Sequence, residues 1–405
     1  MKFDTIIIGG GLCGLTAGIA LSRQGRKCMI VSAGQSALHF FSGSFELYNG
    51  EHPLEKIEAL AETHPYSKIG KENVARLAAE VKGFFADAGI KLKGETETNH
   101  SRVTPLGAVK DAWLTLDEYV TLPRAAKKIA LVNLEGYLDF QTSFVARLLD
   151  ISGLECQLST VSLSELESLR KNPTEMRATH IAKALSGEAM DVLAGKLNTI
   201  SDEVEEIWMP AVVGLDSDRD VELLRSKVNR PLYFIATLPP STPGIRVQLL
   251  LKKYFQSLGG TYLLGDSVTG GEFKDGRLLA VSTANHGEAA FTADSYVLAS
   301  GSFFSRGLEA TQDKVIEKTF GLDVDYVEDR TGWYEENVFT AQPYMNFGVR
   351  TDKELHPYKD GIRVENIWAA GSVLSGCNAV EEGCGAGVAL LSALRVSELI
   401  AAKEE

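Results

Sequence analysis

The sequence is poor in cysteine and has no local cysteine motif. Its 405 residues include five cysteines, and no two of them form a Cys-x-x-Cys pair. They are Cys13, Cys28, Cys156, Cys377 and Cys384. An odd, scattered set argues against a disulfide framework and against a zinc or iron–sulfur site contributed by this chain, so we predict no metal site. It fits a reduced, cytoplasmic setting. We interpret each cysteine as a small buried residue, with a redox role for Cys377 and Cys384 as the alternative.

Positive charge and long hydrophobic runs are also scarce. Forty-one Lys and Arg stand against 54 Asp and Glu, the net charge is −13, and no basic stripe is present. This pattern makes nucleic acid an unsuitable partner. Residues 5–22 are apolar enough to imitate a signal peptide, but Asp4 precedes them and they contain five glycines. No other stretch is long enough to span a membrane, so we expect no direct transmembrane segment.

The first 32 residues carry the most informative pattern in the chain. Residues 2–8 predict a buried strand, residues 12–24 a helix, and residues 27–31 a second strand. The turn between the first two elements reads Gly9-x-Gly11-x-x-Gly14. In a β-α-β unit this is the dinucleotide-binding fingerprint, in which the glycines admit a phosphate to the helix N-terminus. The alternative is that these glycines serve packing alone.

One residue that usually accompanies the fingerprint is missing. An Asp or Glu is expected after the second strand to hold the adenosine ribose, and Ser32 stands there instead. The following segment is rich in hydroxyls and aromatics and predicts a loop that contacts the cofactor. Its candidate binding residues are Ser36, Ser42, Gly43 and Ser44. The alternative is a buried turn in which Ser42 and Ser44 satisfy backbone groups.

Two later segments return the chain to the same sheet. Residues 294–302 predict an apolar strand that ends in small residues at Gly301. Residues 366–371 predict a buried strand ending at Gly371-Ser372, and residues 384–403 a long helix with a glycine-rich start. We predict that this helix directs N–H groups at a cofactor, the alternative being simple closure of the sheet. His39, Arg246 and Arg350 are weaker candidates for a base and for phosphate ligands.

These elements predict an α/β chain with a Rossmann-like FAD/NAD(P)-binding flavoprotein fold and an inserted α+β substrate or cap domain. The predicted boundaries are 1–100 for the first part of the nucleotide-binding domain, 101–240 for the insert, 241–300 for the second part, 301–355 for a segment returning to the cap, and 356–405 for the last strand and helix.

Several motifs narrow the flavoprotein prediction to one family, and they occur from one end of the chain to the other. They are Phe3–Leu12 (FDTIIIGGGL), Gly34–Phe40 (GQSALHF), Ser42–Ser44 (SGS), Thr104–Gly107 (TPLG), Gln342-Pro343 and Phe347–Asp352 (FGVRTD). The sequence resembles the B-subunit family of anaerobic glycerol-3-phosphate dehydrogenase, a family of two-domain flavoproteins.

The resemblance implies a complex that oxidises sn-glycerol 3-phosphate to dihydroxyacetone phosphate. The partners of the B subunit would be an FAD-bearing catalytic subunit and an iron–sulfur, membrane-anchoring subunit that passes electrons to quinone. The B subunit would be cytoplasmic, peripheral on the inner membrane through a partner. Two other functions stay as alternatives: a non-catalytic subunit for assembly or electron relay, and a stand-alone FAD-dependent oxidoreductase of another substrate.

The cofactor implied for the B subunit is FMN, with FAD as the alternative. FMN has no adenosine ribose, so it does not need the acid that Ser32 replaces. Ser372 likewise stands where flavoproteins usually carry an acid. The candidate cofactor-binding residues are Gly9, Gly11, Gly14, Ser32, Ser36, Ser42, Gly43, Ser44, Gly301, Gly371 and Ser372. Covalent attachment of the flavin through His39 is a further hypothesis. No catalytic residue is assigned.

Overall fold

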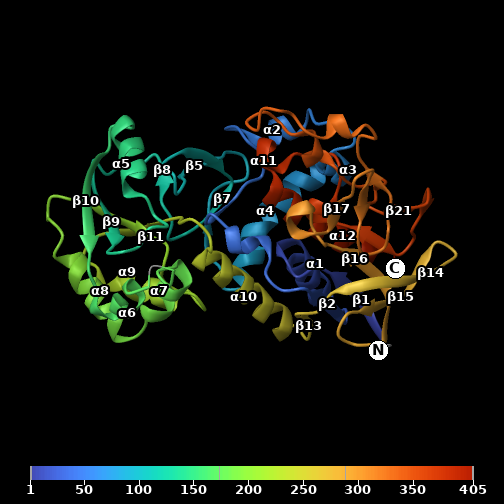
Figure 1. Ribbon diagram of the computed structural model, residues 1–405, viewed down its shortest axis with the longest axis horizontal. Coiled ribbons are helices and arrows are strands. Elements are labelled where there is room, and N and C mark those ends of the chain that lie inside the picture. The colour runs from blue at the N-terminus through green and yellow to red at the C-terminus, as the bar shows by residue number, and fades with distance from the viewer. Residues whose placement is uncertain (1, 173, 288, 404–405) are drawn as a thin grey trace.

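The computed structural model describes residues 2–172, 174–287 and 289–403. A seven-stranded sheet organises one half of the molecule, on the right in Figure 1. Its strand order is β13-β2-β1-β16-β15-β14, and β23 pairs with β16 off this path. The bounds are Thr261–Leu264 (β13), Cys28–Ser32 (β2), Lys2–Ile8 (β1), Ala290–Leu298 (β16), Arg277–Thr283 (β15), Val268–Lys274 (β14) and Ile367–Ala369 (β23).

The centre of this sheet is parallel. β1 pairs in parallel with β2 and β16, and Ile8 is level with Val31 on one side and Leu298 on the other. Ile6 and Ile7 are fully buried, as expected where both faces of a parallel sheet are covered. The carboxyl ends of three neighbouring strands therefore meet at one edge, where open α/β sheets bind ligands.

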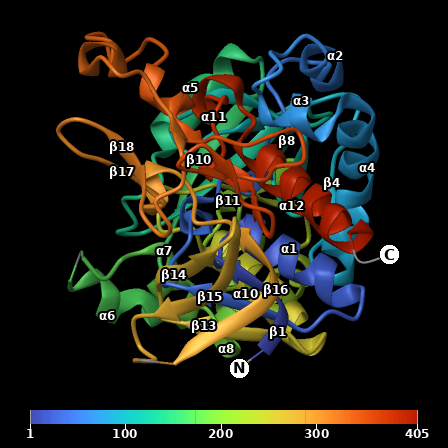
Figure 2. The same cartoon turned by 90° about the vertical axis from the view of Figure 1, so that its right-hand side faces the viewer.

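Three long helices pack beside this sheet. They are α1 (Leu12–Arg23), α10 (Thr242–Ser257) and α12 (Gly385–Ala402), and α1 contacts both others. α12 also contacts α4 (Lys71–Asp87) and α3 (Pro65–Ile69), and Figure 2 shows α12 beside α4. The sequence predicts that Thr242 caps this helix with Pro243 at its first position, but α10 begins one residue earlier, at Thr242. The extended residue Ser241, and not Thr242, accepts the N–H of Gly244 with its hydroxyl.

A second sheet lies in the other half of the molecule, on the left in Figure 1. Its order is β10-β9-β11-β12, and every neighbouring pair is parallel. The strands are Lys128–Leu134 (β9), Glu155–Val161 (β10), Glu206–Pro210 (β11) and Leu232–Ile235 (β12). The helices of this half are Thr142–Ile151 (α5), Glu167–Arg170 (α6), Ala178–Ala184 (α7), Glu188–Asn198 (α8) and Arg219–Lys227 (α9).

Small antiparallel sheets complete the fold. One has the order β3-β7-β4 and another β6-β5-β8. Their strands are Ser44–Phe45 (β3), Leu92–Lys93 (β4), His100–Val103 (β5), Val109–Ala112 (β6), Leu114–Leu116 (β7) and Thr121–Leu122 (β8). Two-stranded sheets are also present. β17 (Leu308–Ala310) pairs with β18 (Val315–Glu317), β19 (Val324–Asp325) with β20 (Gly348–Val349), and β21 (Tyr358–Lys359) with β22 (Ile362–Arg363). The remaining short helices are Pro53–Ile57 (α2) and Ala379–Glu382 (α11), both labelled in Figure 1.

One helix corrects the expectation that no stretch after residue 22 has the length to span a membrane. α12 has 18 residues with a mean hydropathy of 1.5, so by length and composition alone it could cross a membrane. The same window is 56% buried inside the fold. Its contacts with α1, α3 and α4 account for its apolar composition, as for the core helix of a folded domain.

The contact between α1 and the turn that precedes it leaves no room for a methyl group. A Cβ on Gly14 would lie 1.8 Å from the carbonyl oxygen of Gly9, a backbone atom that cannot move independently. We expect Gly14→Ala to lower the stability by about 1–3 kcal/mol, measured as a lower urea midpoint.

The matched control is Gly83→Ala. Gly83 is exposed within α4, and an added Cβ there meets nothing within 4 Å. Alanine is the better helix former by about 0.8–1 kcal/mol, so this variant should unfold at an equal or higher urea concentration. Equal midpoints for Gly14→Ala and the parent chain would contradict the packing argument.

Candidate functional site

A cavity of about 580 Å³ opens at the carboxyl ends of β1, β2 and β16. Its walls come from the fingerprint turn, the 32–46 segment, the 299–305 segment and the start of α12. Eight of the predicted residues line it: Gly9, Gly11, Ser32, Ser36, Ser42, Ser44, Gly301 and Ser372. The fold therefore brings together residues that lie more than 300 positions apart in the chain.

The other three predicted residues do not line the cavity and contact protein atoms instead. Gly14 packs against the fingerprint turn, as described above. A Cβ on Gly43 would lie 2.2 Å from the ring of Tyr119, and one on Gly371 would lie 2.9 Å from Cys13. The space at these positions is used for close packing beside the cavity.

The fingerprint turn is shaped to hold an anion. Gly9 has a φ of +116°, and a Cβ there would lie 2.1 Å from the carbonyl oxygen of Ala299. The N-cap of α1 is Gly11, which supplies no side chain to the first N–H groups of the helix. Ser300 lines the same cavity, and its buried hydroxyl has no partner among the described residues. Uncapped helix N–H groups and an unpartnered hydroxyl fit a phosphate-bearing cofactor.

The end of β2 has no carboxylate for a ribose. Ser32 is buried there, and Tyr262 donates its hydroxyl hydrogen to the carbonyl of Gly10 at 3.2 Å. The adjacent Asp266 is 3% exposed. Its carboxylate is occupied by the N–H of Ser267 and by the ring of His286, at 2.8 and 2.7 Å.

None of the three weaker candidates from the sequence lines the cavity. His39 lies between two lining residues, and burial lowers the pKa of its imidazole. Arg246 is buried in an ion pair with Glu118, and Arg350 pairs with Asp325 at 2.6 Å. We therefore do not retain His39 as the base or covalent attachment point, nor the two arginines as phosphate ligands.

The structure adds two charged residues that the sequence did not single out. Arg102 and Glu46 both line the cavity, and Arg102 Nη2 donates to Glu46 Oε1 at 2.7 Å. Arg102 lies on β5, directly before the TPLG motif, and Glu46 follows β3. That neighbouring motif was the only signal in the sequence, because the two residues meet only through tertiary contacts.

A chain of hydrogen bonds leads away from the cavity beside this pair. The hydroxyls of Ser44 and Thr115 are 2.7 Å apart, and His100 Nε2 is 2.6 Å from the Thr115 hydroxyl. Burial, together with the charges of Lys93 and Arg102, lowers the pKa of His100 to about 4. The imidazole is therefore neutral at pH 7 and orients the two hydroxyls without adding charge.

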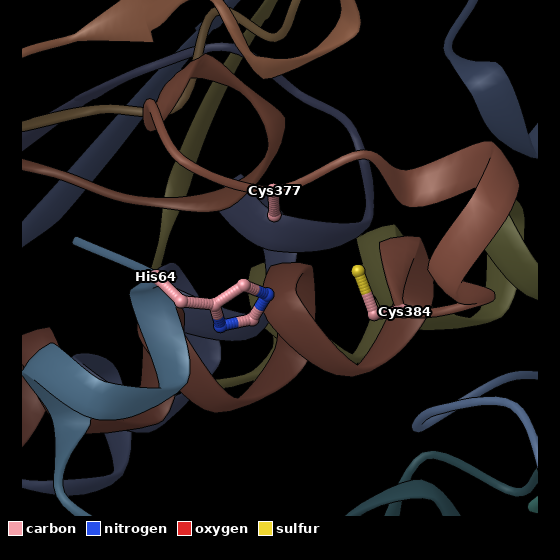
Figure 3. Close-up of side chains that lie close together, drawn as sticks. All are labelled: His64, Cys377 and Cys384. Atoms are coloured by element: carbon pink, nitrogen blue, oxygen red, sulfur yellow. The ribbon is translucent and has the colours of Figure 1, made fainter. Parts of the chain in front are cut away.

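A second buried cluster lies beside the start of α12. The ligand atoms of His64, Cys377 and Cys384 all lie within 4.8 Å of one another. Figure 3 shows the His64 imidazole directed toward Cys384, with Cys377 on the loop between β23 and α11. The cysteine spacing did not predict this group, because a histidine more than 300 residues earlier completes it. Thiolates and imidazole are ligands that zinc prefers.

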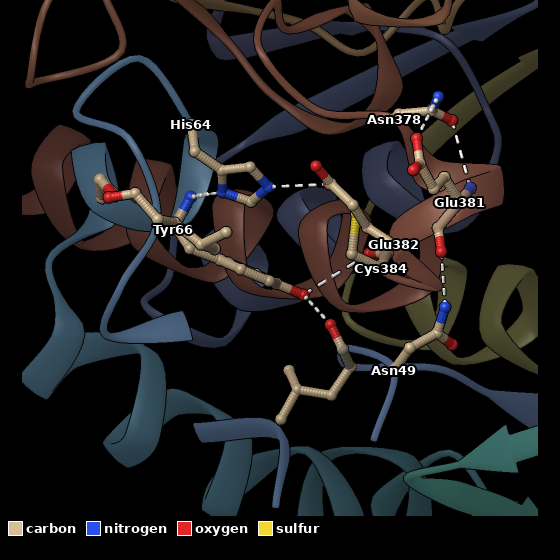
Figure 4. Close-up of polar contacts among 10 residues, drawn as sticks. Asn49, His64, Tyr66, Asn378, Glu381, Glu382 and Cys384 are labelled. Carbon is tan, nitrogen blue, oxygen red and sulfur yellow. Dashed lines mark hydrogen bonds and ion pairs between the residues drawn. The ribbon is translucent and has the colours of Figure 1, made fainter. Parts of the chain in front are cut away.

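The hydrogen bonds of this cluster show how it is satisfied without a metal ion (Figure 4). His64 Nδ1 accepts the N–H of Tyr66 at 3.1 Å, so the neutral ring carries its proton on Nε2 and donates to Glu382 Oε2 at 3.2 Å. The Cys384 thiol donates to the same oxygen at 3.3 Å. Hydrogen bonding with Cys377, together with burial, raises the pKa of the Cys384 thiol. A cation on Nε2 would need the opposite tautomer and would break the cap of α3.

Comparison with known proteins first defines the class. A family model described as an FAD binding domain matches residues 4–388, nearly the whole chain. This match and the Rossmann-like sheet with its fingerprint turn define a flavoprotein with the fold of an FAD-binding oxidoreductase. The predicted Rossmann-like flavoprotein fold is thereby confirmed, and a flavin is the cofactor that this class binds. The predicted α+β character of the insert is not, because its four-stranded sheet is parallel throughout.

Relatives then define the particular family. The chain is 42% identical to the B subunit of anaerobic glycerol-3-phosphate dehydrogenase from Yersinia pseudotuberculosis, over 99% of this chain and 98% of that protein. It is 37% identical to the protein of the same name in Glaesserella parasuis, over 99% of both chains. The chain belongs to the B-subunit family of anaerobic glycerol-3-phosphate dehydrogenase, as its motifs predicted. The family name implies a complex with other subunits.

Among solved structures, 3-ketosteroid delta1-dehydrogenase from Sterolibacterium denitrificans aligns over 99% of this chain and 100% of its own, with 11% identity and a TM-score of 0.48.

The proton arrangement in the His64 cluster predicts a structural role. His64→Ala removes the cap of α3 and a buried hydrogen bond to Glu382, so we expect a loss of about 2 kcal/mol of stability, read from the urea midpoint. His52→Ala is the control, because His52 is exposed and its side chain does not cap α2. A chelator should leave the parent midpoint unchanged. A midpoint that falls after chelation would show instead that a metal ion holds the cluster together.

Proposed function

We propose that this chain is the flavin-binding subunit of an anaerobic glycerol-3-phosphate dehydrogenase complex, in which sn-glycerol 3-phosphate is oxidised to dihydroxyacetone phosphate. The observation that carries the proposal is the cavity at the sheet edge, in a chain whose relatives bear this name over their full length. Electrons pass to quinone through two partners, an FAD-bearing subunit and an iron–sulfur, membrane-anchoring subunit. The chain is cytoplasmic and peripheral on the inner membrane through those partners.

Within this proposal two sets of segments divide the work. Residues 1–100, 241–300 and 356–405 form the nucleotide-binding domain, and residues 101–240 and 301–355 form the cap that shapes the substrate end of the cavity. Arg102, on β5 of the cap, supports this division because it lines the same cavity as residues of the large sheet.

The cofactor is FMN in this proposal. The N–H groups at the start of α1 and the Ser300 hydroxyl hold its phosphate. Ser32 offers no carboxylate for an adenosine ribose, and the Asp266 carboxylate beside it is occupied. When bound, the flavin supplies a two-electron acceptor for the substrate hydride.

The residues of this chain bind the substrate and take its proton. Oxidation of a secondary alcohol releases a hydroxyl proton to a nearby base. Glu46 is the only carboxylate among the described residues that line the cavity, so it is the group placed to accept this proton. The Ser44 hydroxyl, oriented by Thr115 and His100, donates to or accepts from the substrate hydroxyl.

The identity of the flavin can be checked directly. The purified full-length chain should be yellow, and acid precipitation should release all of the colour, because His39 does not line the cavity. Mass spectrometry of the supernatant should identify FMN. FAD in the supernatant would overturn the FMN assignment, and colour retained in the pellet would show covalent attachment.

The reaction is tested under anaerobic conditions with the same preparation. Glycerol 3-phosphate should bleach the flavin absorbance and yield dihydroxyacetone phosphate, whereas glycerol at equal concentration should not. The absent carboxylates at Ser32 and Ser372 favour one other function, a non-catalytic subunit retained for assembly. A colourless chain that still binds the FAD-bearing catalytic subunit would establish that alternative. A flavin that glycerol 3-phosphate does not reduce, but another substrate does, would point to a stand-alone oxidoreductase.

A further inference from the structure

Arg102 is a buried cation with most of its hydrogen-bonding capacity unused. Its side chain is 9% exposed, and its Nε is buried with no partner among the described residues. A guanidinium has five N–H donors. Among the described residues, only Glu46 Oε1 accepts a hydrogen bond from it, through Nη2. Nη1 has no acceptor in this part of the chain, and the residue lines the cavity.

Such an arrangement is unfavourable unless a further acceptor completes it. A buried guanidinium loses hydration, and each N–H left without an acceptor adds to the free-energy penalty. Glu46 compensates the charge through one oxygen but leaves the rest of the planar fork free. An oxyanion with several oxygens, such as a phosphate monoester, matches the two-pronged geometry that arginine presents.

The surroundings of Arg102 also favour an anion. Gly385 and Ala386, at the start of α12, line the same cavity. The N-cap Cys384 has no side-chain hydrogen bond to the first N–H groups of α12, and the N–H of Gly387 donates to the carbonyl of Glu46 at 2.9 Å. The positive end of an 18-residue helix therefore lies beside the Glu46–Arg102 pair.

We propose that Arg102 binds the phosphate of the substrate and so selects phosphorylated over free polyols. This inference rests on the proposed function and adds the residue that recognises the substrate class. Arg102 belongs to the small antiparallel sheet β6-β5-β8, whereas the fingerprint turn belongs to the seven-stranded sheet. The cavity thus has two anion-binding walls, one for the phosphate of the flavin and one for the phosphate of the substrate.

The test is the anaerobic reduction of the flavin in the full-length holoprotein at varied glycerol 3-phosphate. Arg102→Gln should raise the apparent Kd for glycerol 3-phosphate about 10- to 100-fold, as for loss of hydrogen bonds to a charged group. The limiting rate should change much less, because the hydride donor carbon and the flavin are untouched. Arg102→Lys keeps the charge but not the forked donor geometry, so its apparent Kd should lie between those of the parent chain and Arg102→Gln.

Glu46→Gln is a comparison variant on the other member of the pair, and its limiting rate of flavin reduction should fall because Glu46 is also the proposed base. It removes a negative charge beside the proposed phosphate site, so the apparent Kd for glycerol 3-phosphate should stay equal or fall. Weaker binding in Glu46→Gln than in Arg102→Gln would overturn the assignment. Flavin content and urea midpoint are measured for every variant, and Arg102→Lys carries the test if Arg102→Gln does not fold.

Two further outcomes separate this inference from its alternatives. If Arg102→Gln loses flavin while the remaining holoprotein keeps the parent Kd for glycerol 3-phosphate, Arg102 serves the cofactor and the inference fails. If the parent chain is not reduced by glycerol 3-phosphate, the proposed function fails, and calorimetry with inorganic phosphate tests the anion site alone. Phosphate binding that disappears in Arg102→Gln supports the site, and equal binding in both proteins overturns it.

Discussion

The structure depends on a close backbone contact between the end of β1, the start of α1 and the end of β16. The Gly9 turn lies against the carbonyl of Ala299, and Gly14 lies against the carbonyl of Gly9, at separations that exclude any side chain. This contact fixes the direction of α1 relative to the sheet. It also leaves the first N–H groups of α1 facing the cavity, so the packing constraint and the anion site are the same feature.

The start of α12, which also lines the cavity, depends on a network of buried polar groups. Tyr66 donates its hydroxyl hydrogen to the carbonyl of Leu47, and Glu382 accepts hydrogen bonds from His64 and Cys384. These bonds connect the segment that carries Glu46 with the turn that starts α12. A buried network of this kind is favourable only when its members are satisfied. Its role is to hold the start of α12 where Gly385 and Ala386 line the cavity.

Much of the fold follows from local sequence. The β-α-β start and the helix α12 could be predicted to within a few residues, because each combines a hydrophobic pattern with glycine signals at its ends. The strand predicted over residues 294–302 is only the second part of β16, which runs from Ala290 to Leu298. The sequence did not reveal that β9 to β12 form a parallel sheet, because strand pairing is decided by contacts distant in the chain. The cap of α10 was placed one residue late because Ser241 and Thr242 both carry a hydroxyl that can cap a helix.

The nucleotide-binding turn, the family motifs and the missing acid after β2 can all be recognised in the sequence, since each lies in consecutive residues. The folded chain was needed to show that Gly14, Gly43 and Gly371 lie outside the cavity lining and that His39 is not part of it. It alone paired Arg102 with Glu46 and brought His64 to Cys377 and Cys384. The physical reason is the same in each case. Burial, charge pairing and proton position depend on neighbours that the chain brings together from distant segments, and no local spacing encodes them.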